Sequence, residues 1–319
     1  MKLALLFPGQ GSQRVGMGSD FRRMSQRARS CYEAASSILG YDLAAMCDNG
    51  PIEYLSRTIH AQPALYVTSC AALETLREHV RDIQPAAVAG HSVGEYAALY
   101  AAGAVTFEEG LRLVSERARL MDEAARARPG SMIAILGAEP DMVEGCCREA
   151  SGLGVVVIAN DNGAGQLVIS GEQRAVEEAA RLARERGARR TVPLAVSGGF
   201  HSPLMAEAAA RMGSVLDTAP LNDPGIPIVT NVLADYCRTA ECIRSSLRRQ
   251  IAEGVRWREC MQRLFDDGAQ LLLELGAGEV LTGLAKRMRS EIVAIAVHDE
   301  ASLLRAAEAA RATQGGSGR

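Results

Sequence analysis

The pattern of apolar and polar positions divides most of the chain into alternating strands and helices. Helical periodicity is predicted up to residue 39 and over residues 65–79 and 95–102. Short apolar runs predict the strands, which are residues 3–7, 85–89, 226–231, 271–275 and 292–297. Strands that alternate with helices in this way are typical of a parallel sheet covered by helices.

The middle of the chain follows a different order. Its elements are a strand at 132–136, a helix at 140–150, strands at 155–159 and 166–170, a helix at 173–186 and a strand at 191–196. This βαββαβ order predicts a small ferredoxin-like domain inserted into the larger one.

The predicted fold is therefore α/β, with a large α/β-hydrolase-like parallel-sheet domain and a small ferredoxin-like domain. We assign residues 1–126 and 198–312 to the large domain and 127–197 to the small one, and expect a flexible tail over 313–319. The cleft between two such domains is the expected place for an active site.

The segment Gly90-His91-Ser92-Val93-Gly94 follows a predicted strand and precedes a predicted helix. Flanking glycines allow the tight strand-to-helix turn on which serine hydrolases present a nucleophile, because no β-carbon fits where the two backbones crowd together. An ordinary turn that contains serine is the alternative, and the motif alone does not decide between them.

A serine nucleophile needs a base, and the chain has five histidines. His79 lies on a charged helix and is expected at the surface, and His60 has no distinguishing context. His91 is adjacent to Ser92, but neighbouring side chains at an elbow diverge. We therefore expect His91 to bond to backbone and to act as a supporting residue.

Two histidines remain as the base. His298 follows the predicted strand 292–297, the place where an α/β-hydrolase carries its catalytic histidine. His201 lies where the inserted domain returns to the large one, after glycines that allow close approach to a ligand. Position slightly favours His298, and these observations leave the choice open.

A helix that begins near Thr106, in a capping-box pattern, carries an arginine on its apolar side. At 100° per residue Arg117 falls in the middle of the apolar arc, where its guanidinium must meet an anion. An internal acidic partner is the common solution. The functional interpretation is a substrate that ends in a free carboxylate, which the fork of arginine binds through two hydrogen bonds.

Composition and charge limit the kinds of partner, the compartment and the metal sites that we expect. A net charge of −3 and a pI near 6.0 argue against a nucleic-acid partner. No apolar run is long enough to span a membrane and no signal-peptide core is recognised, so the cytoplasm is the expected compartment. The eight cysteines lack C-x-x-C spacing, and Cys237 and Cys242 are the only close pair besides the adjacent Cys146 and Cys147, so no metal site is expected.

The chain resembles the malonyl-CoA:acyl-carrier-protein transacylase family from about residue 3 to residue 297. The resemblance is carried by residues 6–13 (LFPGQGSQ), 90–96 (GHSVGEY), 116–121 (ERARLM), 130–135 (GSMIAI), Asn160 with 166–171 (QLVISG), 200–205 (FHSPLM), Gln250 with 255–257 (VRW), and 274–276 (ELG). A dinucleotide site at Gly9 is excluded because Arg14 stands where the third glycine belongs.

The resemblance implies roles for particular residues. Ser92 would be the acylated nucleophile and His201 its base, in place of His298. The backbone amides of Gln10 and Val93 would form the oxyanion hole. The backbone carbonyl of Gln250 would orient the base, so no acidic third member is expected.

The resemblance also implies the substrates. Malonyl would pass from coenzyme A to the phosphopantetheine thiol of an acyl carrier protein, with no bound cofactor. Its carboxylate would bind Arg117, and Met121, Met132, Asn160 and Phe200 would complete the acyl site, where Phe200 favours malonyl over methylmalonyl.

Carrier proteins are usually acidic, so a basic rim is expected from Arg189, Arg190, Lys286 and Arg287. A serine hydrolase or thioesterase on the same elbow, and a catalytically silent binding protein, are the alternatives. The sequence does not choose among carrier proteins of fatty-acid, polyketide or malonate-decarboxylase metabolism.

Overall fold

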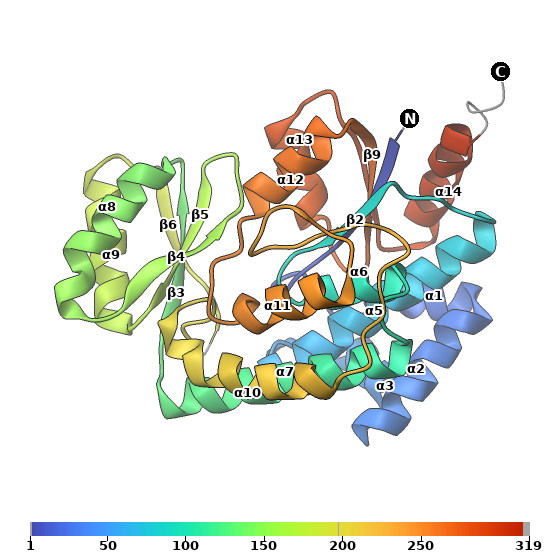
Figure 1. The fold of residues 1–319 in the computed structure, drawn as a ribbon, viewed down its shortest axis with the longest axis horizontal. Helices are drawn as coiled ribbons and strands as arrows, with labels where there is room; N and C mark the ends of the chain where they lie inside the picture. Colours follow the sequence, from blue (N-terminus) through green and yellow to red (C-terminus); the bar gives the residue numbers. More distant parts are fainter. Residues whose placement is uncertain (1, 197, 315–319) are drawn as a thin grey trace.

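The computed structural model describes residues 2–196 and 198–314, which form two units, each built on its own sheet (Figure 1). The two sheets have six and four strands. The smaller unit lies at the left of Figure 1 and contains α8 (Pro140–Ala150) and α9 (Gln173–Glu185). The predicted α/β fold, with a second unit inserted into a parallel-sheet domain, is confirmed.

The large sheet has the strand order β10-β9-β1-β2-β7-β8. All neighbours pair in parallel except β7 and β8. Its strands are β1 (Lys2–Phe7), β2 (Ala87–Gly90), β7 (Ile228–Val229), β8 (Tyr236–Cys237), β9 (Ala269–Leu275) and β10 (Val293–Val297). The register aligns Phe7 with Gly90, so the carboxyl ends of β1 and β2 meet at one edge.

Helices surround this sheet. They are α1 (Ser19–Met24), α2 (Gln26–Leu39), α3 (Leu43–Asn49), α4 (Ile52–Leu55), α5 (Thr58–His79), α6 (Gly94–Ala101), α7 (Phe107–Ala127), α10 (Ala206–Thr218), α11 (Ala240–Gln250), α12 (Trp257–Asp266), α13 (Val280–Met288) and α14 (Glu300–Gln314). Two short 3₁₀ turns are Ser151–Leu153 and Pro203–Met205.

The small sheet is antiparallel, in the order β4-β5-β3-β6. Its strands are β3 (Ser131–Leu136), β4 (Val156–Asp161), β5 (Gln166–Gly171) and β6 (Arg190–Pro193). With α8 and α9 this is the predicted βαββαβ order. The exact boundaries 127–197 stay a prediction, and residue 197 lies outside the described residues.

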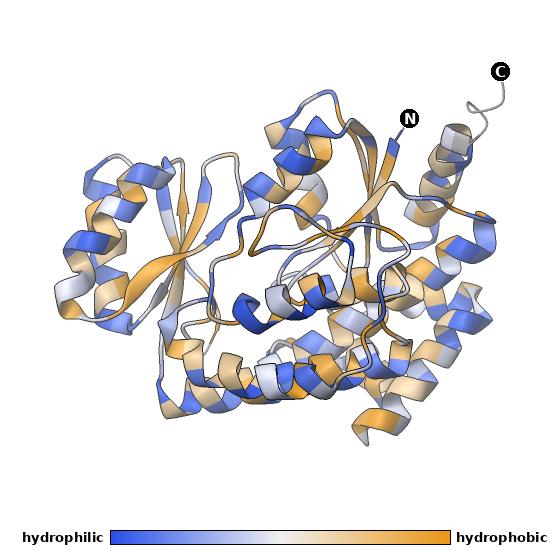
Figure 2. Cartoon of the chain, viewed as in Figure 1, coloured by the Kyte–Doolittle hydropathy of each residue, from blue (hydrophilic) through white to orange (hydrophobic). Residues whose placement is uncertain are grey.

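Strand alternation gives the small sheet two different faces. Ile133 and Ile135 pack in a cluster with residues of α8 and α9, whereas Met132 and Ala134 join the core of the large unit. Because successive side chains of a strand point to opposite faces, one sheet both holds its own helices and closes against the larger unit. Figure 2 shows the largely apolar strands of the small unit with α8 and α9, which carry many polar residues, on one side of them.

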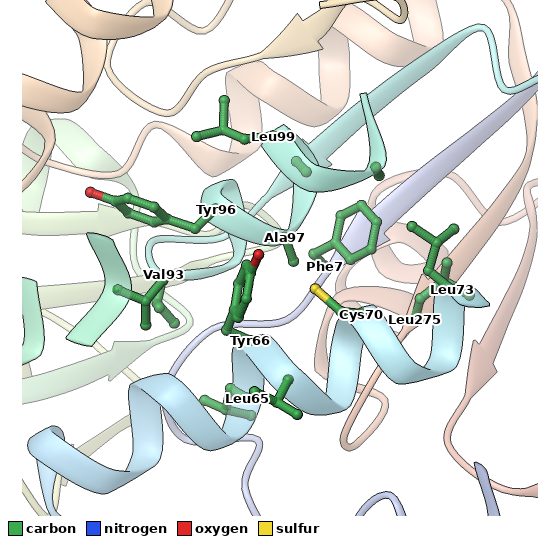
Figure 3. Packing of buried hydrophobic residues seen from close by; sticks show 14 of the residues in the cluster. Phe7, Leu65, Tyr66, Cys70, Leu73, Val93, Tyr96, Ala97, Leu99 and Leu275 are labelled. Atoms are coloured by element: carbon green, nitrogen blue, oxygen red, sulfur yellow. The ribbon is translucent and has the colours of Figure 1, made fainter. Parts of the chain in front are cut away.

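The main core lies between β1 and the long helix α5. Phe7, Tyr66, Cys70 and Leu275 pack together there with Val93, the residue after the predicted nucleophile (Figure 3). Each of these side chains is almost fully buried. Val93, and with it the turn that carries Ser92, is therefore packed into the main core.

Several predicted boundaries are corrected. Helix α5 begins at Thr58 and not at 65, although Pro63, a helix breaker in most contexts, lies inside it. His60 is therefore a buried residue of this helix. Strand β7 is only two residues long. Helix α14 extends to Gln314, into the predicted tail, whose residues 315–319 lie outside the described residues.

Among the described residues, no helix is long and apolar enough to cross a membrane. The same residues hold no group of three or more histidine, cysteine or acidic side chains able to bind a metal ion.

Six cysteines are free and buried. Cys237 and Cys242 form a disulfide, a pairing that the sequence analysis did not predict.

Candidate active site

Three adjacent parallel strands deliver polar residues to one edge of the large sheet. Gln10 follows β1, Ser92 follows β2 and Asn231 follows β7. Because parallel strands end at the same edge, these three residues meet although 221 positions separate the first from the last.

Ser92 sits in the left-handed region, with φ of 52°. A β-carbon at Gly90 would lie 2.0 Å from the carbonyl carbon of Gly94, and one at Gly94 would lie 2.2 Å from the Phe7 oxygen. Both glycines are therefore required by close backbone approach, as predicted. Asn231 braces the turn, since its Oδ1 accepts from Ser92 N at 2.7 Å and its Nδ2 donates to Gly90 O at 2.7 Å.

His201 is the histidine that meets Ser92. Its Nε2 lies 2.8 Å from Ser92 Oγ, and its Nδ1 lies 2.8 Å from the Gln250 carbonyl oxygen and 3.2 Å from that of Glu253. Carbonyl acceptors require a proton on Nδ1, which leaves Nε2 as the acceptor for the serine hydroxyl.

Burial, with the nearby charge of Arg117, lowers the pKa of His201 to about 3. The imidazole is therefore neutral at physiological pH, as a base must be. His298 follows β10, which is separated from β2 by β9 and β1, and its ring lies beside Asp299. It does not line the pocket that contains Ser92.

Arg117, on α7, is 1% exposed and points at the serine. Its Nη1 donates to Gln62 Oε1 at 2.6 Å, and its Nη2 donates to Ser92 Oγ at 3.0 Å and to Gln250 Oε1 at 3.1 Å. Its Nε has no partner. Within the described chain no carboxylate forms an ion pair with Arg117, so no direct contact with an anion offsets its buried charge.

Three residues of this network were not found from the sequence as site residues: Gln62, Glu95 and Asn231. Glu95 is 1% exposed and accepts from Asn231 N and from Gln250 Nε2. Gln62 is fully buried on α5, beside Pro63. A glutamine in a segment with many apolar neighbours is the signal that could have found it, but the predicted helix began only at residue 65.

A cavity of about 420 Å³ lies in front of Ser92. Both units line it, and the predicted acyl-site residues Met121, Met132, Asn160 and Phe200 are all on its wall. Phe200 and Met121 are contributed by the large unit, and Met132 and Asn160 by β3 and β4. The pocket is thus the predicted cleft between the two units.

The Gln10 and Val93 amides, the predicted oxyanion hole, have no hydrogen-bond acceptor among the described residues. Both residues line the cavity. Val93 also precedes the first turn of α6, where helix amides favour negative charge. A β-carbon at Gly9 would lie 2.6 Å from His91 O, so this glycine allows the two turns to approach.

His91 departs from the prediction. Its Nε2 bonds to the Asn162 side chain at 2.8 Å and not to backbone, and its ring meets Trp257 edge to face. His91 thus links the elbow to the loop that follows β4, and both His91 and Asn162 line the cavity.

The predicted basic residues are all exposed. Lys286 and Arg287 lie on α13, whose Val280 and Leu284 line the cavity, and Arg287 Nη2 is 3.5 Å from Oε1 of Gln166 on the same wall. Arg189 packs on Gly137, whose amide bonds to the carbonyl of Gly165 beside Gln166. These contacts bring Arg287 to Gln166 on the cavity wall and Arg189 to the turn beside Gln166, and a docking role for the four basic residues stays a prediction.

Comparison with known proteins identifies this class of site. A family model described as "Acyl transferase domain" matches residues 4–312. The Haemophilus influenzae protein named malonyl CoA-acyl carrier protein transacylase is 40% identical over 301 residues, 94% of this chain and 96% of that protein. The Bacillus subtilis protein of the same name is 40% identical, covering 93% and 94%.

A solved complex is similar in structure. It is a type II polyketide acyl carrier protein with its malonyl-transacylase, matched with a TM-score of 0.94, 40% identity, and coverage of 97% of this chain and 100% of that one. The chain belongs to the acyl transferase domain family, and within it to the malonyl CoA-acyl carrier protein transacylases.

Proposed function

We propose that this protein transfers a malonyl group from malonyl-CoA to the phosphopantetheine thiol of an acyl carrier protein, through a malonyl ester on Ser92. The observation that carries the proposal is the contact of Ser92 Oγ with both a neutral histidine and a buried arginine that has no carboxylate partner. The nucleophile and the group that would bind a carboxylate lie within hydrogen-bond distance of each other. This spacing suits a short acyl group that ends in a second carboxylate.

In the first half-reaction His201 Nε2 accepts the hydroxyl proton while Ser92 Oγ attacks the thioester carbon. The carbon–sulfur bond then breaks, and the coenzyme A sulfur leaves with the proton from His201. The Gln250 carbonyl supports this cycle, because its bond to Nδ1 holds the tautomer and strengthens when the ring is protonated.

Negative charge develops on the thioester oxygen during the attack. The Gln10 and Val93 amides would stabilise this charge, as their lack of other partners suggests. Arg117 would bind the far carboxylate of malonyl and exchange its contact with Ser92 Oγ for a bidentate pair. This exchange would also release the hydroxyl from a donor that opposes its nucleophilicity.

In the second half-reaction the carrier thiol gives its proton to His201 and attacks the ester. Ser92 leaves with that proton, and malonyl stays on the carrier as a thioester. Exposed Arg189, Arg190, Lys286 and Arg287 would guide an acidic carrier to the cavity mouth. The carrier pathway and the cytoplasmic location stay predictions.

The alternative function, a hydrolase that uses the same serine, differs in its acyl acceptor, which is water instead of a carrier thiol. We expect release of the coenzyme A thiol from malonyl-CoA to stop once each enzyme molecule carries one malonyl group. Release should continue only when carrier protein bearing phosphopantetheine is added. Apo-carrier, which lacks the thiol, is the matched control. Continuous release without carrier at the same rate would favour hydrolysis.

A further inference from the structure

The buried carboxylate of Glu95 lies behind the nucleophile, on the side away from the cavity. It is the second residue of α6, three positions after Ser92, and does not line the pocket. Both of its oxygens accept hydrogen bonds from donors, one from the Asn231 backbone amide and one from Gln250 Nε2. These two partners also contact other residues of the site: Asn231 accepts from Ser92 N, and Gln250 accepts from Arg117.

Gln250 has a defined orientation only because of what surrounds its amide. Its Nε2 donates to Glu95 and to Ser92 O at 2.8 Å, while its Oε1 accepts from Arg117 at 3.1 Å. An amide can turn over at little cost unless its neighbours distinguish oxygen from nitrogen. The Glu95 carboxylate and the Ser92 carbonyl only accept and the guanidinium only donates, so these three partners together hold Nε2 toward Glu95 and Oε1 toward Arg117.

From these contacts we infer that Glu95 is a positioning residue, which acts through Gln250 to hold Arg117 ready for the carboxylate of the acyl group. The inference rests on the proposed malonyl transfer and adds a residue that never touches the substrate. The charge of Glu95 also acts against the burial that lowers the pKa of Arg117, with the Gln250 amide between the two charges, and so lowers the cost of burying the guanidinium.

The charge state of Glu95 follows from the groups around it. Burial raises the pKa of Glu95 to about 7, against the hydrogen bonds from Asn231 and Gln250 and the charge of Arg117, which lower it. Two other titratable groups face it, Tyr96 and Cys260, and burial raises the pKa of each, so both stay neutral near pH 7. The ionised form fits the geometry, because both carboxylate oxygens accept.

The decisive variant is Glu95→Gln, which keeps volume but replaces one acceptor by a donor. The Asn231 amide is a fixed donor and takes the remaining oxygen, so the new NH₂ group faces Gln250 Nε2. Gln250 then either keeps its NH₂ group against the new one, or turns over and sets its oxygen against Ser92 O and its NH₂ group against Arg117. Either arrangement disturbs the contact that holds Arg117. We expect kcat/KM for malonyl-CoA to fall about 10- to 100-fold and acetyl-CoA transfer to fall less, because only malonyl uses Arg117.

The same substitution in an Arg117→Ala background separates this role from a general structural one. If Glu95 acts through Arg117, E95Q should change the malonyl-to-acetyl ratio by no more than about 2-fold there. The matched control is Glu74→Gln, which removes a buried carboxylate bonded to Arg77 and Tyr100 and should keep the ratio. An equal loss for both substrates in E95Q, or a ratio change that persists without Arg117, would overturn the inference.

The wild-type protein gives a second measurement that does not depend on how the variant folds. The malonyl-to-acetyl ratio of kcat/KM should rise with pH through one ionisation near 7, and this rise should vanish in Arg117→Ala. A ratio that is flat from pH 5.5 to 8.5, about 1.5 pH units on each side of that ionisation, would contradict the role of Glu95. Wild-type protein that loads no malonyl on Ser92 would instead count against the proposed function.

Discussion

Arg117 Nη2 lies 3.0 Å from Ser92 Oγ, so the same hydroxyl contacts both a base and a fixed positive charge. A buried guanidinium costs several kcal/mol unless an anion or good acceptors compensate it. Here two glutamine oxygens and the serine compensate only in part, and Nε stays unpaired. We therefore expect a carboxylate ligand to complete the hydrogen bonding of Arg117.

Replacing Arg117 by alanine should change the acyl preference. Loss of a charge-assisted bidentate pair lowers kcat/KM for malonyl-CoA by about 10- to 150-fold, while acetyl-CoA is used as well as before or better. The rates of transfer from the two thioesters test this. Arg119→Ala, on the exposed side of the same helix, is the matched control. If R117A used malonyl-CoA as well as the wild-type protein does, the role of the arginine would be structural only.

The two candidate histidines should differ sharply when each is replaced. His201→Ala removes the group within 2.8 Å of Ser92 Oγ and should slow malonyl transfer by about 10²- to 10⁴-fold. His298→Ala should stay close to the wild-type rate, because β9 and β1 separate its strand from the nucleophile's. Single-turnover loading measures the step directly, and the opposite ranking would remove His201 from the mechanism.

The low pKa of His201 predicts an unusual pH dependence. A group whose pKa falls from 6.5 to about 3 stays in its basic form throughout pH 5–8, so the loading rate should show no loss near 6.5 as pH falls. Acetyl-CoA is the proper substrate for this profile, because its acyl group does not use Arg117. A midpoint near 6.5 would mean that His201 is solvated in the working enzyme.

The elbow should tolerate no side chain at Gly94. An alanine there would place its β-carbon 2.2 Å from the Phe7 oxygen, whereas one at Gly152 meets nothing within 4 Å. We expect Gly94→Ala to lower the melting temperature by at least several degrees and to abolish loading, with Gly152→Ala unchanged. Differential scanning calorimetry and the loading assay check this, and a stable, active G94A protein would refute the crowded geometry.

Charge reversal at the cavity mouth should affect only the second substrate. Lys286→Glu with Arg287→Glu should raise KM for the carrier protein several-fold at low salt, with the effect shrinking as salt is added. Loading from malonyl-CoA should change less than transfer to the carrier. Arg305→Glu with Arg311→Glu, at two exposed positions on α14, is the matched control because it changes the net charge equally, and an equal effect there would indicate net charge alone.

The elements with strong periodicity were predictable, and so was much of the site. The bounds of α8 were predicted to the residue, and Ser92, Arg117 and the predicted acyl-site residues all line one cavity, while their roles stay predictions. Arg117 was detectable because a cation in an apolar arc violates helix patterning. His201 could be chosen over His298 only through the family resemblance, since strand order is not encoded locally.

The remaining residues depend on tertiary contacts. Asn231 and Glu95 meet because β7 pairs beside β2, a long-range pairing that no local pattern announces. Helix α5 was shortened in the prediction because Pro63 masked its first turns. The side-chain partner of His91 comes from the other unit, which sequence adjacency could not indicate.

The most direct test of the whole account is mass spectrometry of the protein after incubation with malonyl-CoA, followed by addition of carrier protein bearing phosphopantetheine. We predict one malonyl adduct that maps to Ser92, is absent in Ser92→Ala and disappears as an equal amount of malonyl-carrier forms. An unmodified Ser92, or an adduct that is lost to water without reaching the carrier, would contradict it.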